Sequence, residues 1–345
     1  MKKLIVYLCM ASLAACDAPK TQPEQKMTNN GELLSPNNQI VAFYNVENLF
    51  DVENDPNTLD DDFTPYGDQH WTEERYEQKL QNLSTVLFAL GEQCPMMIGL
   101  VEIENHKVVE DLAKTGNLAN TPYKLVHFES EDRRGIDCAL LYDPRRMKVL
   151  EQEKLVVRLP DNRDFATRDI LHVKATLADG EIVHVFVNHW SSRREGTTES
   201  EVKRVRSATV LKERIAEIRQ EEKDPKILIM GDFNDEPKNK SIQQVLNAAG
   251  KNASLFNLMA EMAYDGEGSI VHQREWLMFD QMMVSQNLLT GTELKIKDNK
   301  AYVYKDESIL FTYSNGGQKP NSTYGGPEYY GGFSDHLPVY LILEK

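Results

Sequence analysis

Short apolar runs that are rich in β-branched residues recur along most of the chain, separated by polar stretches that contain Gly, Pro, Asn and Asp. Runs of this length and composition are typical of β-strands. The predicted strands are residues 40–44, 97–101, 136–142, 170–175, 182–187, 227–230, 281–284 and 337–343. Because strands outnumber helices in this pattern, we expect an α+β fold.

Two longer segments instead carry apolar residues at helical spacing. In residues 72–90 these are Tyr76, Leu80, Leu83, Leu87 and Leu90, and in residues 200–220 they are Val202, Val205, Ala208, Leu211, Ile215 and Ile218. Each segment has a single apolar face, so each helix should cover one side of a sheet. The arrangement that satisfies this pattern is two sheets packed face to face with the helices outside.

The first residues follow a different pattern. Lys2 and Lys3 precede an apolar stretch at residues 4–13, which ends in small residues before Cys16. This is the pattern of a secretory signal, and it is too short for a permanent bilayer-spanning helix. Residues 13–16, Leu-Ala-Ala-Cys, also resemble the lipobox of bacterial lipoproteins, in which the cysteine is acylated and becomes the new N-terminus.

We therefore expect residues 1–16 to be a lipoprotein signal peptide and the mature protein to be exported and anchored to a membrane through a lipid on Cys16. Its place would be the periplasm or the cell surface. The alternative is an ordinary signal peptide with a chance cysteine. Residues 17–38 are rich in Pro, Gln, Asn and Lys and have little to bury, so they should form a flexible tether.

Residues 39–345 contain no internal repeat and no second linker, so we expect one domain, and we expect it to be a monomer. The chain has 345 residues, of which 41% are hydrophobic, and it can therefore bury a full core. Beyond the signal and the lipid site, only Cys94 and Cys138 remain. They allow one disulfide or two buried thiols, and we expect thiols because Cys138 lies in an apolar run.

The net charge is −15, and loss of Lys2 and Lys3 with the signal makes the mature chain more negative still. Proteins that hold long nucleic acids electrostatically are usually basic, at least in patches. The negative charge therefore disfavours binding of long nucleic acids. It does not exclude such binding, because carboxylates that bind a metal ion also add negative charge.

Several predicted strands end in polar residues that a strand end does not require. These are Asn45, Glu102, Asn188 with His189, Asp232 with Asn234, and Asp335 with His336 just before the last strand. Carboxylate and amide oxygens without thiolates suit a hard cation, so we expect magnesium, with manganese or calcium as alternatives. A cation of this kind neutralises phosphate oxygens while a nearby carboxylate or histidine prepares a water molecule for attack.

These motifs, in this order, resemble those of the endonuclease/exonuclease/phosphatase superfamily. The matching elements are Asn45-Val46-Glu47-Asn48, Glu102, Asn188-His189, Gly231-Asp232-Phe233-Asn234, Asp280 and Ser334-Asp335-His336. The resemblance implies a four-layered α/β/β/α sandwich of two mixed β-sheets with helices outside. It also implies a metal-dependent phosphoric ester hydrolase. Within the superfamily, the chain most resembles the secreted or lipoprotein members from bacteria.

The resemblance assigns roles as well. Glu102 would be the principal metal ligand, with Asn45 and Asp335 completing the site. The catalytic group would be His189, Asp232, Asn234, Asp280 and His336. Asp232 and Asn234 would align the water, Asp280 would orient His336, and His189 would contact the phosphate or protonate the leaving group. The general base is either Asp232 or the pair of His336 and Asp280.

The residues expected to bind substrate are Arg134, Arg168, Asn188 and Arg193. For the arginines the reason is that a guanidinium pairs bidentately with phosphate oxygens. The partner would be a phosphate-ester substrate. The leading hypothesis is that this substrate is DNA or RNA and that the enzyme is endonuclease-like. A phosphatase or phospholipase C acting on inositol, sugar or sphingolipid phosphates is the second hypothesis. The third is an inactive lipid-anchored binding protein that kept the fold.

Overall fold

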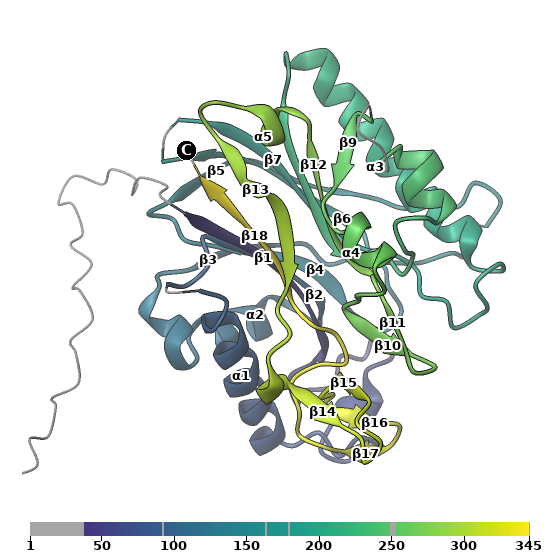
Figure 1. Ribbon diagram of the computed structural model, residues 1–345. Coiled ribbons are helices and arrows are strands. Elements are labelled where there is room, and N and C mark those ends of the chain that lie inside the picture. The colour runs from purple at the N-terminus through teal and green to yellow at the C-terminus, as the bar shows by residue number, and fades with distance from the viewer. Residues whose placement is uncertain (1–37, 92, 163, 179, 249–252, 345) are drawn as a thin grey trace, which may run out of the picture. The chain divides into compact units, whose positions relative to one another are not determined.

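Two six-stranded mixed sheets form the centre of the fold (Figure 1). The structure is a computed structural model that describes residues 38–344 except 92, 163, 179 and 249–252. The first sheet has the order β13 (Lys295–Val303), β18 (Val339–Glu344), β1 (Gln39–Leu49), β2 (Met97–Ile103), β4 (Asp137–Tyr142) and β3 (Lys124–His127). The second has the order β5 (Met147–Leu155), β6 (Ile170–Leu177), β7 (Ile182–His189), β8 (Lys226–Asp232), β12 (Asp280–Ser285) and β9 (Leu255–Asn257).

Each sheet contains one parallel pair at its centre, β1 with β2 and β7 with β8, and its other neighbours are antiparallel. The inner faces of the two sheets share one apolar core, in which Val41 and Phe43 of the first sheet lie with Val185 and Leu228 of the second. All four side chains are buried. The sheets are therefore packed face to face, as the sequence predicts.

Helices cover the outer faces. Helices α1 (Glu73–Phe88) and α2 (His106–Ala113) pack on the first sheet, and α3 (Glu201–Glu221) packs on the second. Leu83 and Leu87 of α1 are fully buried, and burial of one such side chain contributes about 2 kcal/mol. The four layers confirm the predicted α/β/β/α sandwich.

The remaining elements are short. They are α4 (Ala260–Tyr264), α5 (Asn287–Thr290), the 3-10 turns at Asp61–Phe63, Gly116–Asn120 and Glu307–Ile309, and a π-helical turn at Ser241–Leu246. Three two-stranded hairpins are β10 (Ile270–His272) with β11 (Glu275–Leu277), β14 (Leu310–Thr312) with β15 (Gln318–Pro320), and β16 (Tyr324–Gly325) with β17 (Glu328–Tyr329). Figure 1 shows these hairpins gathered at one end of the sheets.

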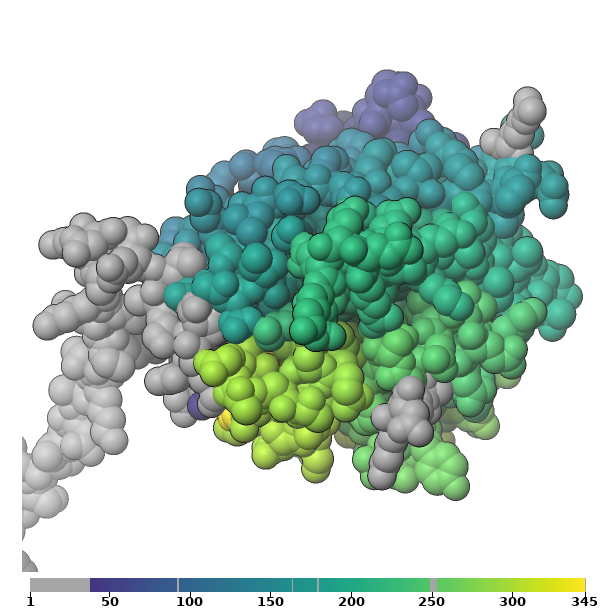
Figure 2. Space-filling model, turned by 90° about the horizontal axis from the view of Figure 1, so that it is seen from above, coloured from purple at the N-terminus to yellow at the C-terminus, as the bar shows by residue number. Residues whose placement is uncertain are grey.

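The two ends of the sandwich differ. Strands β1, β2, β7 and β8 finish at the end where β12 begins, so their polar terminal residues meet there. The opposite end carries α5 and the C-terminal end of α3, at the top of Figure 1, and Figure 2 shows this end from above. The predicted site residues at the strand ends therefore lie at the end that is low in Figure 1.

All eight predicted strands and both predicted helices are present, with ends shifted by a few residues. Strands β3, β5, β9 and β13, the three hairpins and helices α2, α4 and α5 were not predicted. Both Cys94 and Cys138 are buried free thiols, as expected. Within the described ranges, no helix is both long enough and apolar enough to cross a membrane. The predicted signal peptide, the lipid site at Cys16 and the tether up to residue 37 lie outside the described residues and stay predictions.

Candidate active site

Backbone irregularities in β1 and β2 aim side chains at the end of the sheet. The pairing of these strands shifts register between Asn45 and Leu49, and β2 shifts against β4 between Val101 and Ile103. Glu102 lies in this second irregularity with φ of +62°. A left-handed non-glycine residue is strained, and bulges commonly redirect a side chain beside a functional site. Because of this irregularity, the side chain of Glu102 does not follow the regular alternation of side chains between the two faces of the sheet.

Asn45 connects the carboxylates. Its Nδ2 lies 3.1 Å from Asp232 Oδ2, 3.4 Å from Glu102 Oε1 and 3.5 Å from His336 Nε2. Its Oδ1 accepts a hydrogen bond from the backbone N–H of Glu47 at 3.0 Å, which fixes the orientation of the amide. In this orientation Asn45 presents a donor to the site, and its oxygen faces away from the carboxylates.

Asp232 stands at the centre of the cluster. The residue before it, Gly231, allows the neighbouring strand to pass close by. A Cβ at residue 231 would lie 2.5 Å from the backbone oxygen of Asn188 on that strand. The backbone N–H of Asn234 holds Asp232 Oδ1 at 2.9 Å, and the side-chain amide of Asn234 lies 3.3 Å from Oδ2 and 3.0 Å from the carbonyl of Trp190. Oδ2 is therefore the oxygen that faces the other site residues.

His336 is held from the far side by Asp280. Its Nδ1 lies 2.6 Å from Asp280 Oδ2, and Ser269 donates its hydroxyl to the same oxygen while accepting the backbone N–H of Asp280. The hydroxyl of Ser334 donates to the carbonyl of Asn45 at 2.7 Å and accepts the N–H of His336. The Ser-Asp-His segment is thus tied to both sheets, with His336 Nε2 3.9 Å from Asp232 Oδ2.

His189 approaches Asp232 from the end of β7. Its Nε2 lies 3.6 Å from Asp232 Oδ2 and 3.8 Å from Glu102 Oε1. Its side chain is almost fully buried, and its Nδ1 has no hydrogen-bond partner among the described residues. Because Nε2 faces two carboxylates, the proton of a neutral ring belongs on Nε2.

The two histidines have opposite electrostatic surroundings. Burial, aided by Arg168 and Arg134, lowers the pKa of His189 well below its ordinary value, so the ring is neutral. Burial also opposes the charge of His336, but Asp280 and Asp335 outweigh it and raise the pKa of this ring well above its ordinary value. His336 is therefore protonated.

The carboxylates also differ. Burial raises the pKa of Asp232 to about 6, against the opposing effect of His336. Burial would raise the pKa of Glu102 too, but Arg134, His336 and Arg168 together hold it below its ordinary value. Glu102 is therefore a permanent anion, whereas Asp232 is poised to accept a proton near neutral pH.

The predicted substrate-binding residues fall into two groups. Arg134 contacts Asn48 and lies 3.8 Å from Glu102 Oε2, with a third of its side chain exposed at the mouth. Arg168 is close behind it and donates to Asp132 and to the carbonyl of Trp190. The structure thus brings two cations to the acidic cluster.

Asn188 and Arg193 lie behind the site and support it. The fully buried Asn188 accepts from Trp190 Nε1 and donates to the carbonyl of Met230. Arg193 donates to the carbonyl of Asn234 and to Asp235 at 2.8 Å. Both side chains are occupied with protein partners, so their contacts fix the loop that carries Asn234.

The donor set fits a hard divalent cation. Glu102, Asp232 and the half-exposed Asp335 supply carboxylates, and the described residues place no cysteine thiol among them. Asp232, Asp280 and His336 also lie close enough together to hold an ion. However, the Nδ1 of His336 is already occupied by Asp280, which leaves Glu102 and Asp335 as the better ligands.

Three supporting residues were not assigned a role from the sequence: Ser269, Glu47 and Lys79. Lys79 is buried and donates to Thr323 Oγ1 and to the carbonyl of Phe333, both at 2.6 Å. Glu47 accepts the N–H of Thr323 at 2.6 Å. A signal for Lys79 exists in the sequence, because it falls on the apolar face of the predicted helix, where a charge needs a partner.

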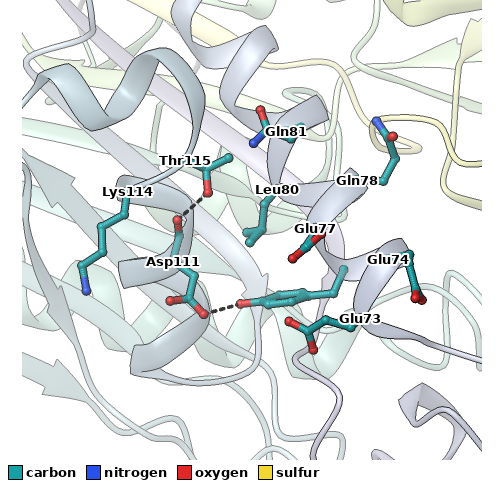
Figure 3. A pocket seen from close by; sticks show the side chains of 10 residues that line it. Glu73, Glu74, Glu77, Gln78, Leu80, Gln81, Asp111, Lys114 and Thr115 are labelled. Carbon is teal, nitrogen blue, oxygen red and sulfur yellow. Dashed lines mark hydrogen bonds between the residues drawn. The ribbon is translucent and has the colours of Figure 1, made fainter.

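A separate cavity of about 670 Å³ lies between α1 and the end of α2 (Figure 3). Its lining includes four carboxylates, those of Glu73, Glu74, Glu77 and Asp111, and Asp111 accepts a hydrogen bond from Tyr76. Because this lining would repel a phosphate group, the cavity is not a second phosphate site.

The chain is similar to one protein family and to several solved structures. The profile of the endonuclease/exonuclease/phosphatase family matches residues 40–345. A search of curated proteins found no match. Among solved structures, an endonuclease/exonuclease/phosphatase family protein from Bacteroides thetaiotaomicron is 17% identical, with a TM-score of 0.56 and coverage of 90% of this chain and 99% of that one.

Two further solved structures are similar to this chain. Mannosyl-6-phosphatase from Bacteroides thetaiotaomicron is 16% identical, with a TM-score of 0.55 and coverage of 88% of this chain and 99% of that one. TDP2 from D. rerio, in complex with a single-strand DNA product, is 15% identical, with a TM-score of 0.54 and coverage of 89% and 99%. At these identities the likeness shows the fold.

Proposed function

The chain belongs to the endonuclease/exonuclease/phosphatase family and is a phosphoric ester hydrolase, and from this premise we propose that it is a divalent-metal-dependent phosphodiesterase acting on an ester of the nucleic-acid type. The observation that carries the proposal is the buried Asp232 carboxylate, with His189 and His336 approaching the same oxygen from two sides. The enzyme assignment removes the alternative of an inactive binding protein.

Glu102 and Asp335 would hold magnesium, and manganese or calcium would fit the same oxygen ligands. When bound, such an ion neutralises negative charge on the phosphate and on the departing oxygen. Asn45 would fix the positions of Glu102 and Asp232 through its amide nitrogen, which presents a donor to both carboxylates.

The protein's own groups supply the proton transfers. Asp232 Oδ2 would accept a proton from the attacking water, since Oδ1 is already held by Asn234 and Oδ2 faces the site. His336, kept in place through its Nδ1 by Asp280, would donate from Nε2 to a phosphate oxygen. His189, whose ring is neutral, would donate a hydrogen bond from Nε2–H to the oxygen of the leaving group and keep its proton. Arg134 at the mouth would pair with the phosphate.

A panel of phosphate esters assayed with magnesium and with EDTA tests this proposal. It should contain DNA, RNA, bis(4-nitrophenyl) phosphate, 4-nitrophenyl phosphate and mannose 6-phosphate. We expect metal-dependent cleavage of the diesters. Cleavage of monoesters alone would contradict the proposed phosphodiesterase and would identify the protein as a phosphatase.

The phosphatase remains the second candidate because two observations favour it. The net charge of −15 is unfavourable for a protein that holds a long polyanion. One of the similar structures is a mannosyl-6-phosphatase. In the panel this candidate predicts the inverse order of activity, with the monoesters cleaved faster than the diesters.

We also propose that the protein is exported and anchored to a membrane through a lipid on Cys16. The support is the order of Lys2 and Lys3, the apolar residues 4–13 and the Leu-Ala-Ala-Cys sequence. Labelling of the full chain with a radioactive fatty acid in a bacterial host tests this. Cys16→Ser should abolish the label, and equal labelling of the two forms would contradict the lipid site.

A further inference from the structure

A pocket of about 510 Å³ is built from the hairpins at the catalytic end of the sheets. Its lining is Phe311, Tyr313, Lys319, Asn321 and Tyr330. The three aromatic rings are each about half exposed, at 45%, 43% and 52%. Exposed aromatic side chains gathered in one place commonly mark a binding surface.

The rings of this pocket are held in position by the backbone and by each other. Phe311 and Tyr313 pack edge to face with their centroids 5.1 Å apart. Tyr330 lies against Gly325, where a Cβ would approach the ring to 2.3 Å, so a side chain at residue 325 would displace the ring from this position. The pocket is therefore preorganised despite its exposure.

Among the residues that line the pocket, one is a cation, and it lies over two of the aromatic rings. Lys319 is the direct cross-strand partner of Phe311, and its Nζ lies 5.7 Å from the centroid of Phe311 and 5.8 Å from that of Tyr330. In a protein of net charge −15 this places a positive group beside flat apolar surfaces. A ligand that fits has a planar ring joined to an anionic group.

The pocket is tied directly to the catalytic segment. The carbonyl of Asn321 accepts the N–H of Phe333, the residue before Ser334, at 2.6 Å. The N–H of Tyr330 donates to the carbonyl of Thr323, whose own N–H bonds to Glu47. Strand β15 also contacts β10, which forms a bridge from Ile270 to His336. The backbone of the pocket is thus bonded to the segment that carries His336.

From this arrangement we propose that the pocket is a subsite for a nucleobase of the substrate. The base stacks between Phe311 and Tyr330, while Lys319 pairs with the phosphate backbone that connects the base to the scissile ester. This inference rests on the proposed phosphodiesterase function and names its substrate class, a nucleotide ester. It also explains how an acidic protein holds such a substrate, through stacking on rings more than through charge.

Two esters with the same leaving group test the subsite: thymidine 5′-(4-nitrophenyl) phosphate and methyl 4-nitrophenyl phosphate. Only the first carries a base. For Phe311→Ala and Tyr330→Ala we expect kcat/KM of the thymidine ester to fall about tenfold, the scale of base stacking on one aromatic side chain, with the methyl ester unaffected. Gly325→Ala, which displaces Tyr330, should have the same selective effect.

Tyr264→Ala is the matched control, since Tyr264 is 92% exposed outside the pocket, and it should affect neither ester. Equal losses on both esters, or no loss on the thymidine ester, would overturn the subsite. So would a dependence on these rings for mannose 6-phosphate alone. If the wild type cleaves neither ester, the phosphodiesterase proposal fails, and binding of thymidine 5′-monophosphate tests the subsite by itself: tighter binding to wild type than to Phe311→Ala supports it, and equal binding refutes it.

Discussion

Replacing Asp280 by asparagine should separate the charge that supports His336 from the shape of the site. Asp280 is fully buried and its Oδ2 lies 2.6 Å from His336 Nδ1. Asparagine keeps the volume and an acceptor but removes the negative charge. A hydrogen bond to a charged partner contributes roughly 1.5–3 kcal/mol, so kcat should fall roughly 10- to 100-fold in Asp280→Asn.

The same substitution should also lower stability. Asp280 Oδ1 has no hydrogen-bond partner among the described residues, so an amide nitrogen at that position would be a buried donor without an acceptor there. The cost of such a group is about 1–3 kcal/mol. Urea unfolding of wild type and variant measures this cost independently of activity.

The activity assay is the pH dependence of kcat with bis(4-nitrophenyl) phosphate at saturating magnesium. Asp280 helps to raise the pKa of His336, so in Asp280→Asn this pKa falls and the alkaline limb of the profile moves to lower pH. Ser269→Ala, which removes the other partner of Asp280 but keeps its charge, serves as control and should change the profile less. A variant with full kcat and an unmoved alkaline limb would refute the role of the pair.

Three further predictions concern other parts of the molecule. Glu102→Ala should lose activity mainly through weaker metal binding, so excess magnesium should restore part of the rate; no rescue at any magnesium concentration would contradict its role as a ligand. Lys79→Met leaves the buried Glu47 without its cation and should cost roughly 3–5 kcal/mol in urea unfolding, part of which Lys79→Met combined with Glu47→Gln should recover; no recovery would mean that the two residues are not a pair. Burial lowers the pKa of His172 to about 4, so the unfolded chain binds the extra proton first and stability should fall as pH drops from about 6.5 to about 4. His172→Gln should flatten this dependence in urea unfolding measured at several pH values, and an unchanged slope would contradict the assignment.

The sequence predicted the centre of each sheet well but not its edges. Central strands such as β7 and β8 are buried on both faces and read as continuous apolar runs. Strand β5, at the edge of the second sheet, reads Met-Lys-Val-Leu-Glu-Gln-Glu-Lys-Leu and is largely exposed. Its strand character comes from pairing with β6, which no local pattern of hydrophobic residues records.

The site shows a similar division. Polar residues after apolar strands predicted that Glu102, Asp232 and His336 would meet, because strand ends meet at one end of a sheet. What the pattern could not predict is orientation. The amide of Asn45 is turned by the N–H of Glu47, and Asn188 is drawn into the protein by Trp190 and Met230. These side-chain orientations depend on local backbone geometry and on hydrogen bonds between residues that are distant in sequence.

The aromatic pocket was not anticipated either. Its residues come from strands of two or three residues and from the glycine-rich stretch before Ser334, where periodicity carries little information. Tyr330 is positioned by the missing side chain of Gly325, which is a matter of close approach in space. The closeness of this stretch to Ser334 in the chain does not indicate that it presents aromatic rings.

The most direct test of the account is the rate of bis(4-nitrophenyl) phosphate hydrolysis by wild type and Asp232→Ala, each with magnesium and with EDTA. Asp232 is the proposed base, so we predict magnesium-dependent turnover in the wild type that falls about a hundredfold or more in the variant. Turnover that survives EDTA, or that Asp232→Ala leaves intact, would contradict metal-dependent hydrolysis with Asp232 as the base.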